Sequence, residues 1–133
     1  MAGISNANPD QIKQATEILG GRLVSVQNEF SPSYRSSEPE LALCGEMGIA
    51  FLPWSPLGGI SKAEELGAQH AAFQEVAAAR GVSPQQVALA WMLGKGPHVI
   101  PIPGSSRPET IRDSAAAVDL TLSPDEMAAL DKA

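Results

Sequence analysis

Short apolar runs alternate with longer segments of helical pattern along this 133-residue chain. The apolar runs predict strands at residues 23–27, 49–52 and 98–102. The intervening pattern predicts helices that begin near Asn8, Pro39, Ala71, Ser83, Ser106 and Ser123. Strands that alternate with helices in this way are typical of an α/β fold with a parallel sheet.

Capping residues mark the predicted helix ends. Residues 8–11 combine an N-cap, a proline in the first turn and a glutamine three residues after the cap, and residues 83–86 have the same arrangement. Gly48 and Gly81 are placed to end two helices. Segment 87–93 is apolar all round, so we expect it to be buried as packing rather than to form a cofactor site.

The residues suited to bind a ligand lie at the ends of the predicted strands. Segments 26–30, 51–59 and 99–106 each begin apolar and stop abruptly at polar, aromatic or glycine residues. The run at 49–52 is apolar throughout, as expected for a strand where helices cover its neighbours and the outer face of the sheet. Because parallel strands open at their carboxyl ends onto the ligand site of β/α proteins, these three ends predict such a site.

Composition narrows the function classes. The chain is 44% hydrophobic and 18% charged, and no apolar run is long enough for a membrane span, so we expect one globular domain and no membrane partner. No secretory signal is visible at the start, which predicts cytoplasmic residence. A net charge of −6 without a run of cations argues against a nucleic acid partner.

Some site types are not supported by the sequence. Cys44 is the single cysteine and stands in an apolar stretch, so we expect a buried core thiol, and with His70 and His98 alone it predicts no metal site. Neither the glycine-rich Rossmann motif nor the P-loop motif occurs. An anionic cofactor would therefore be held by backbone N–H groups and a few side chains.

Together, segment 3–6, the three strand ends and residues 122–124 resemble the C-terminal half of the aldo/keto reductases, NADP(H)-dependent oxidoreductases built on a (β/α)8 TIM barrel. The resemblance covers nearly the whole chain and begins at the tail of the fifth strand. A complete barrel takes roughly 250 residues. The resemblance thus implies that residues 1–133 are a single partial barrel domain, the cofactor-binding half, without the first four βα units.

For the nicotinamide end of the cofactor, the resemblance implies that Ser5, Asn6 and Gln27 hold the carboxamide, which hydroxyl and amide groups can bond. The alternative is that Ser5 and Asn6 only form a turn. The indole of Trp54 is implied to stack on the nicotinamide ring, or else to cap the core as a structural aromatic.

The phosphates and the adenosine are implied to lie along two further segments. The matching loop beside the pyrophosphate has two glycines and includes Ser55, Pro56, Leu57 and Gly58. The site for the 2′-phosphate, which favours NADP(H) over NAD(H), comprises Gly104, Ser105, Ser106 and Arg107 at a helix N-terminus. A capping box from Ser106 to Glu109 is an alternative that can coexist with it. The adenosine end matches Thr110, Asp113 and Ser114.

Hydride chemistry in the family also uses a tyrosine acid supported by lysine, aspartate and histidine, and no residue here matches these positions, so no catalytic residue is predicted. Tyr34 is interpreted as a substrate-loop or surface residue. The first hypothesis is a cofactor half that reduces a small-molecule carbonyl substrate once an N-terminal half completes the barrel. The alternative, motivated by the absent tetrad, is a non-catalytic NADP(H)-binding or scaffold half-barrel that acts as an oligomer. Unpaired strand edges favour such self-association as well as pairing with a missing half.

Overall fold

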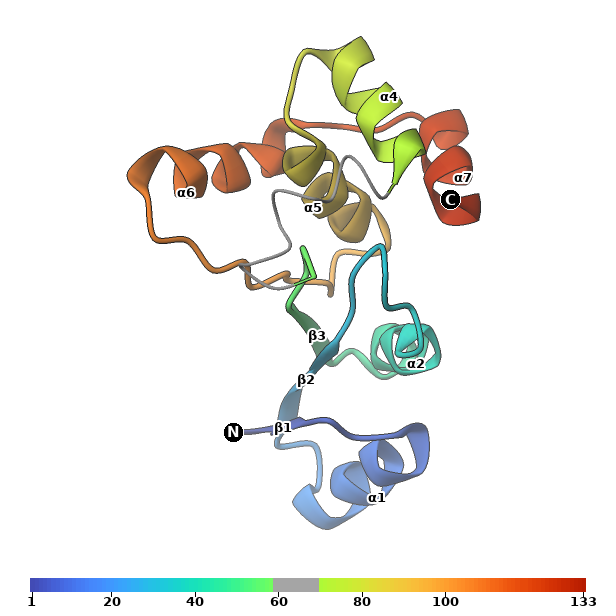
Figure 1. Cartoon of the computed structure of the whole chain (residues 1–133). Helices are drawn as coiled ribbons and strands as arrows, with labels where there is room; N and C mark the ends of the chain where they lie inside the picture. Colours follow the sequence, from blue (N-terminus) through green and yellow to red (C-terminus); the bar gives the residue numbers. More distant parts are fainter. Residues whose placement is uncertain (59–69) are drawn as a thin grey trace.

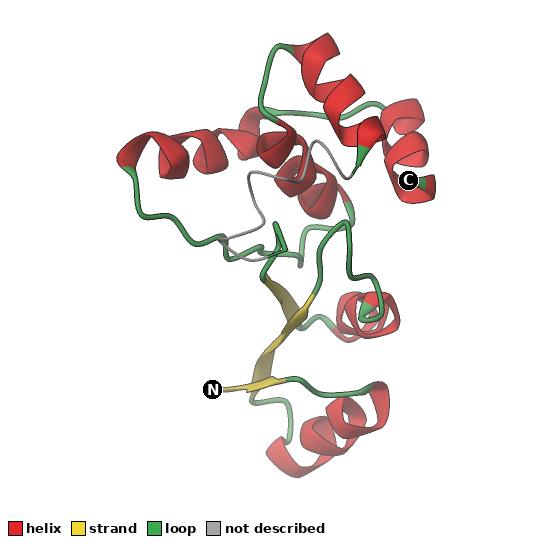
Figure 2. Cartoon of the chain, in the orientation of Figure 1, coloured by secondary structure: helices red, strands yellow, loops and turns green. Residues whose placement is uncertain are grey.

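Three parallel strands in the order β1-β2-β3 form the sheet of the computed structural model, which describes residues 1–58 and 70–133 (Figures 1 and 2). Gly59, the second glycine of the predicted pyrophosphate loop, lies outside the described residues. The strands are β1 (Ala2–Ser5), β2 (Leu23–Glu29) and β3 (Ala50–Trp54). The helices are α1 (Pro9–Leu19), α2 (Glu38–Met47), α4 (Ala71–Arg80), α5 (Pro84–Gly94), α6 (Pro108–Ala115), the 3₁₀ helix η2 (Ala116–Asp119) and α7 (Pro124–Lys132).

Most of the predicted helix ends are confirmed. At α1, the Asn8 side chain accepts a hydrogen bond from the Gln11 N–H, and the Gln11 side chain accepts one from the Asn8 N–H, both at 2.9 Å. Gly48 and Gly81 adopt the left-handed conformation, with φ of 68° and 67°, and end α2 and α4. Capping residues that are recognisable in the sequence therefore set where α1 begins and where α2 and α4 end.

Two predicted caps are wrong in detail. Ser83 caps α5, but the Gln86 side chain donates to the Asp113 carbonyl at 3.0 Å instead of completing a capping box. The capping box from Ser106 to Glu109 does not form, because the N-cap of α6 is Arg107 and makes no side-chain capping bond. Ser105 explains the shift, since its hydroxyl accepts from the Arg107 N–H and donates to the Arg107 carbonyl.

The two faces of the sheet differ in burial. Helices α1 and α2 lie on the same side of the sheet (Figure 1), and side chains such as Val26 and Phe51 are fully buried on that side. On the other face, Gln27, Leu52 and Trp54 are only half-buried. The outer, helix-facing side of β3 is therefore covered, as expected for the apolar run at residues 49–52, whereas its opposite side is less covered.

Segment 98–102 lies along β3 without forming the predicted regular strand. The Phe51 N–H donates to the His98 carbonyl and the Ile100 N–H to the Phe51 carbonyl, each at 2.8 Å. A single parallel bridge joins Phe51 and Val99. Prolines 53, 101 and 103 have no N–H to donate, so they interrupt the ladder that a strand would need.

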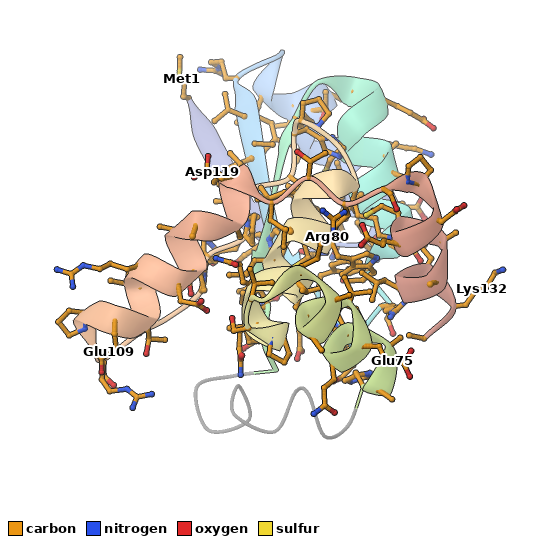
Figure 3. All side chains as sticks on the ribbon, turned by 90° about the horizontal axis from the view of Figure 1, so that it is seen from above. Met1, Glu75, Arg80, Glu109, Asp119 and Lys132 are labelled. Atoms are coloured by element: carbon orange, nitrogen blue, oxygen red, sulfur yellow. The ribbon has the colours of Figure 1, made fainter. Side chains whose placement is uncertain are left out.

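Trp91 on α5 is at the centre of the main core, as predicted for packing. Its ring stacks on Phe30 at a centroid distance of 5.5 Å and meets Phe73 edge-on at 5.7 Å. Its indole N–H donates to Asp131 on α7 at 2.8 Å. Figure 3 shows α4 and α7 side by side, where Arg80 pairs with Glu126. These contacts hold the C-terminal helices together beside the sheet.

Candidate functional site

The carboxyl ends of the strands bring the first predicted residues together. Ser5 ends β1 and is the register partner of Gln27, and Glu29 at the end of β2 is the register partner of Trp54. Register partners in parallel strands project to the same face. Ser5, Gln27 and Trp54 thus belong to the less covered face, at the edge where the sequence predicted a ligand site.

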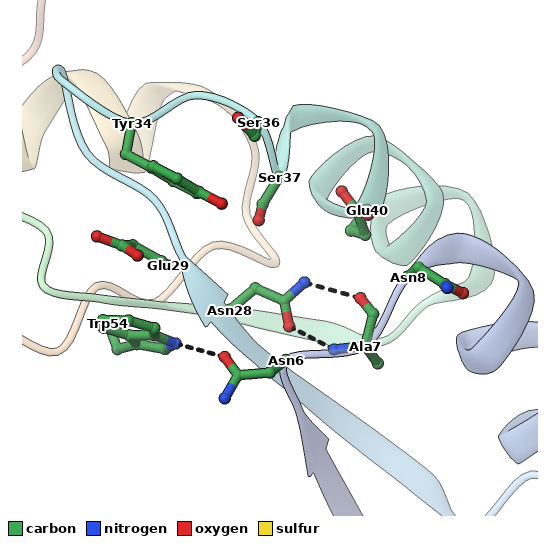
Figure 4. Close-up of a pocket in the computed structure, with 10 residues that line it drawn as sticks. All are labelled: Asn6, Ala7, Asn8, Asn28, Glu29, Tyr34, Ser36, Ser37, Glu40 and Trp54. Carbon is green, nitrogen blue, oxygen red and sulfur yellow. Dashed lines mark hydrogen bonds between the residues drawn. The ribbon is translucent and has the colours of Figure 1, made fainter.

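Asn6 and Trp54 are linked directly. The Trp54 indole N–H donates to the Asn6 Oδ1 at 3.0 Å (Figure 4). Asn6 adopts a left-handed backbone, with φ of 53°, and its own N–H donates to the Gln27 carbonyl at 3.0 Å. Asparagine tolerates this conformation better than most residues. The bond fixes the plane of the indole and leaves the Asn6 NH₂ as the donor that can reach a ligand carbonyl.

Asn28 supports this arrangement and was not singled out from the sequence. Its side-chain amide accepts from the Ala7 N–H at 3.1 Å and donates to the Ala7 carbonyl at 2.8 Å. Asn28 is 5% exposed, and it occupies the helix-facing side of β2 between Gln27 and Glu29. A polar residue at a buried strand position needs such partners. Side chains alternate between the two faces of a strand, and this alternation places Asn28 on the same buried side as Val26; that was the sequence signal that could have identified it.

The loop after β3 turns sharply. Ser55 has φ of 48° and Gly58 has φ of 78°, and the Gly58 N–H donates to the Ser55 carbonyl at 2.9 Å. Pro56 and Leu57 are buried. Ser55, Gly58 and the backbone are therefore the parts of this predicted loop that a ligand can meet, while Leu57 packs into the core.

The predicted phosphate segment lies at the surface. Gly104, Ser105, Ser106 and Arg107 are all exposed, just before the first turn of α6. The Arg107 side chain is 61% exposed and lies 3.8 Å from a Glu109 oxygen. An exposed cation at the N-terminus of a helix suits a phosphate, because the first backbone N–H groups of a helix also favour an anion.

The three predicted adenosine residues are on α6 but not equally exposed. The Asp113 carboxylate accepts a hydrogen bond from Ser83, which joins α6 to the start of α5. Ser114 is 7% exposed and lines a groove together with Leu89 and Ala117. Thr110 is half-buried. Asp113 thus takes part in contacts between helices, and Ser114 is nearly inaccessible.

A pocket of about 430 Å³ opens beside Trp54 and Asn6 (Figure 4). It lies over the end of β2, between the starts of α1 and α2. Its lining residues are Asn6, Ala7, Asn8, Asn28, Glu29, Tyr34, Ser36, Ser37, Glu40 and Trp54. Tyr34, which the sequence assigned to a substrate or surface loop, is 41% exposed at its wall. The pocket combines amides, hydroxyls and carboxylates next to a fixed indole.

Three further features of the described residues bear on the sequence predictions. Residues 1–58 and 70–133 contain no group of three or more His, Cys, Asp or Glu placed to hold a metal ion. Within the same ranges no helix has both the length and the apolar character needed to cross a membrane. Cys44 is fully buried, as expected, and burial together with the Glu40 carboxylate raises the pKa of its thiol to about 11.

Comparisons with known proteins find the same family that the sequence resembles. The model of the aldo/keto reductase family matches residues 1–133. A pyridoxine 4-dehydrogenase of Escherichia coli K12 is 36% identical over 97% of this chain and 43% of its own length. A 6-dehydroglucose reductase of Agrobacterium fabrum is 32% identical over 90% of this chain and 41% of its own length.

Solved structures share the fold. An aldo/keto reductase of Klebsiella pneumoniae in complex with NADP and acetate superposes with a TM-score of 0.86 and 27% identity. The match covers 98% of this chain and 46% of that one. The described chain therefore spans less than half the length of the proteins it matches.

Proposed function

Because the chain belongs to the aldo/keto reductase family and forms part of its barrel, we propose that it is the cofactor-binding C-terminal half of an NADP(H)-dependent reductase of aldehydes or ketones. The observation that carries the proposal is the indole of Trp54 at the carboxyl edge of the sheet, held by Asn6, whose backbone N–H is bonded to the Gln27 carbonyl. NADPH supplies the hydride when bound, and the residues of this chain fix where the ring lies.

At the nicotinamide end, we assign the carboxamide to Ser5, Asn6 and Gln27. Register places Ser5 beside Gln27, and the Asn6 backbone is bonded to the Gln27 carbonyl, so the three side chains belong to one edge. The Asn6 NH₂ donates to the oxygen of the nicotinamide carboxamide, and the side-chain oxygen of Gln27 accepts from the carboxamide nitrogen. Stacking on Trp54 then decides which face of the ring is presented.

At the phosphate end, Ser105, Ser106 and Arg107 hold the 2′-phosphate that distinguishes NADP(H) from NAD(H). The exposed guanidinium supplies a charge-assisted bond, and the N-terminus of α6 supplies backbone N–H groups. The loop from Ser55 to Gly58 borders the pyrophosphate. Thr110 contacts the adenosine, with Asp113 and Ser114 mainly positioning α6.

In this proposal the remaining half of the barrel provides the catalytic Asp, Tyr, Lys and His.

The remaining half also covers the apolar edge formed by the segment beside β3. Ile100 and Ile102 on this segment are 51% and 39% exposed. A groove of about 240 Å³ lies between this segment and α6, and Ile111 and Val118 are exposed along it. The matched relatives are more than twice as long as this chain, and their further βα units are the occupant we propose for this edge.

A titration of the 133-residue chain with NADPH, followed by tryptophan fluorescence with light scattering on the same sample, tests the proposal. We expect saturable binding that Arg107→Ala weakens roughly tenfold to a hundredfold, the value of a bond to a charged group. Arg22→Ala, which removes an exposed arginine before β2, is the matched control and leaves the affinity unchanged. Absence of saturable binding contradicts the assignment.

A complementation assay separates the two function classes. A reductase half turns over aldehydes with NADPH only after a segment carrying the catalytic tetrad is added. A chain that binds NADPH as a stable oligomer and gains no turnover from such a segment is instead the non-catalytic half-barrel.

A further inference from the structure

One serine hydroxyl in the pocket beside Trp54 is not used by the fold. Ser37 lines this pocket, is 9% exposed and is the N-cap of α2. An N-cap serine ordinarily has an extended backbone and accepts a hydrogen bond from the second or third N–H of its helix. Ser37 instead has ψ of 13°, and the second residue of α2 is Pro39, which has no N–H. Its side chain therefore makes no capping bond.

The Ser37 hydroxyl is directed into the pocket. Figure 4 shows its oxygen turned toward the space between Tyr34 and Asn28. Within residues 1–58 and 70–133, no hydrogen bond reaches this hydroxyl. In the same ranges, the one side-chain N or O atom that is both sealed from solvent and unpaired is the Glu40 Oε2, so the Ser37 Oγ retains access to solvent. A hydroxyl on a nearly buried side chain that is unbonded but accessible can be satisfied by a ligand.

The groups around Ser37 are mostly neutral and can both donate and accept. The Tyr34 hydroxyl points into the same space (Figure 4) and has no partner in the described part of the chain. Ser36 adds an exposed hydroxyl at the rim. None of the described lining residues is Lys, Arg or His, so the charge of an anionic ligand would not be compensated. Ligand hydroxyls match these groups, because each hydroxyl can donate to one partner and accept from another.

The loop that carries these hydroxyls is held by contacts outside the pocket. The Ser31 N–H donates to the Tyr34 carbonyl at 2.9 Å, and the Tyr34 N–H donates to the Ser31 carbonyl at 3.1 Å. Arg35 donates to the carbonyls of Asp131 and Leu130 at the end of α7, at 2.8 and 3.1 Å. Because the loop is already ordered, a ligand bound by Tyr34 and Ser37 does not bear the entropic cost of ordering it.

We propose that Ser37 and Tyr34 form a hydroxyl-binding subsite that selects neutral, polyhydroxylated compounds as substrates. The inference rests on the proposed function, because Asn6 and Trp54 belong both to the pocket and to the nicotinamide site. Ser5 and Gln27 do not line the pocket, so its other walls are available to a second ligand. A volume of about 430 Å³ is within the range of small-molecule sites and holds a six-membered ring with its substituents.

Two neutral compounds with one ring skeleton test the subsite. The first, 1,5-anhydro-D-glucitol, carries ring hydroxyls, and the second, tetrahydropyran-2-methanol, lacks them. Each is titrated into the ¹⁵N-labelled chain without NADPH, and the signals of the Trp54 indole N–H and the Ser37 amide report occupancy of the pocket. We expect the first compound to bind at least about tenfold more tightly than the second, a difference of about 1.4 kcal/mol.

Matched variants assign the preference to the two hydroxyls. Ser37→Ala and Tyr34→Phe each remove one hydroxyl and are expected to reduce the ratio of the two affinities, which approaches one in the double variant. Ser33→Ala is the control, because Ser33 is in the same loop but bonds to His70 and does not line the pocket, so the ratio is unchanged. Because Ser37 makes no capping bond, Ser37→Ala should leave the urea midpoint of unfolding unchanged.

Three results would overturn the inference. They are equal affinities or no binding for the two compounds, a preference that survives the double variant, and a preference lost in Ser37→Ala together with a lower urea midpoint, which would assign the hydroxyl to the fold. The same samples separate the inference from the proposed function. NADPH binding without the hydroxyl preference refutes the subsite alone, whereas a preference that depends on Ser37 in a chain that does not bind NADPH refutes the cofactor assignment and leaves the subsite standing.

Discussion

Replacing Asn28 with alanine tests how the strand ends are held in place. The Asn28 amide bonds both the N–H and the carbonyl of Ala7, which is 7% exposed. Asn28→Ala leaves two buried backbone groups without partners, and each costs about 1–3 kcal/mol. We therefore expect the free energy of unfolding to fall by about 2–6 kcal/mol.

Urea unfolding followed by tryptophan fluorescence, at one fixed protein concentration, measures this loss. Asn8→Ala is the control, because it removes another asparagine of the same pocket but only an N-cap bond, worth about 1 kcal/mol. The reasoning is refuted if Asn28→Ala costs no more than Asn8→Ala.

Asn28→Asp adds a pH signature. A carboxylate at this position still accepts from the Ala7 N–H but has no proton for the Ala7 carbonyl, so the folded state favours the neutral acid. The pKa of the new carboxyl is then higher in the folded than in the unfolded state. The deficit in stability relative to the wild type is therefore small below the unfolded pKa and grows as the pH rises through the folded pKa. A deficit that is constant with pH contradicts this geometry.

Asn28→Ala is also expected to affect function. Ala7 follows Asn6, whose side chain holds Trp54. Loss of the Asn28 bonds is expected to weaken NADPH binding, whereas Asn8→Ala leaves it nearly unchanged. Titration of both variants with NADPH makes the comparison.

Three further predictions concern the scaffold. Gly45→Ala places a Cβ 2.8 Å from the His98 ring, so we expect a loss of about 1–3 kcal/mol by urea unfolding, and much less than additive loss in a double variant with His98→Ala. The bond from Arg80 lowers the pKa of Glu126 to about 2, so the stability that this pair adds is complete above about pH 4.5 and is lost as the pH falls toward about 2; NMR titration checks this, and a Glu126 carboxyl that titrates near 4.5 contradicts it. Burial raises the pKa of Cys44 to about 11, so thiol reagents at pH 8 should modify it only as fast as the chain unfolds, and rapid modification of the folded chain would show that the thiol is accessible.

Local signals in the sequence predicted much of the fold. Asn8 with Gln11, and the left-handed glycines 48 and 81, place helix ends through bonds between near neighbours. Features that depend on distant partners could not be predicted in this way. Gln86 bonds to Asp113, 27 residues away, instead of its own N-cap, and Ser105 shifts the start of α6 to Arg107.

For the candidate site, the sequence predicted that Ser5 and Gln27 meet at one edge of the sheet, but not the other contacts at that edge. Ser5 and Gln27 are brought together as expected, since register follows from parallel strands. The bond between Asn6 and Trp54 joins residues 48 apart, and that between Asn28 and Ala7 joins residues 21 apart. Such contacts depend on the twist and register of the sheet, which no short motif encodes.

The most direct test of the cofactor assignment is an NMR titration of the ¹⁵N-labelled chain with NADPH, with attention to its two indole N–H signals. The Trp54 indole lies at the proposed nicotinamide site, whereas the Trp91 indole is bonded to Asp131 in the core. We predict a saturable shift of the Trp54 signal and of the amides of Ser105–Arg107, with the Trp91 signal unchanged. Saturable binding that shifts neither Trp54 nor the start of α6 would contradict the account.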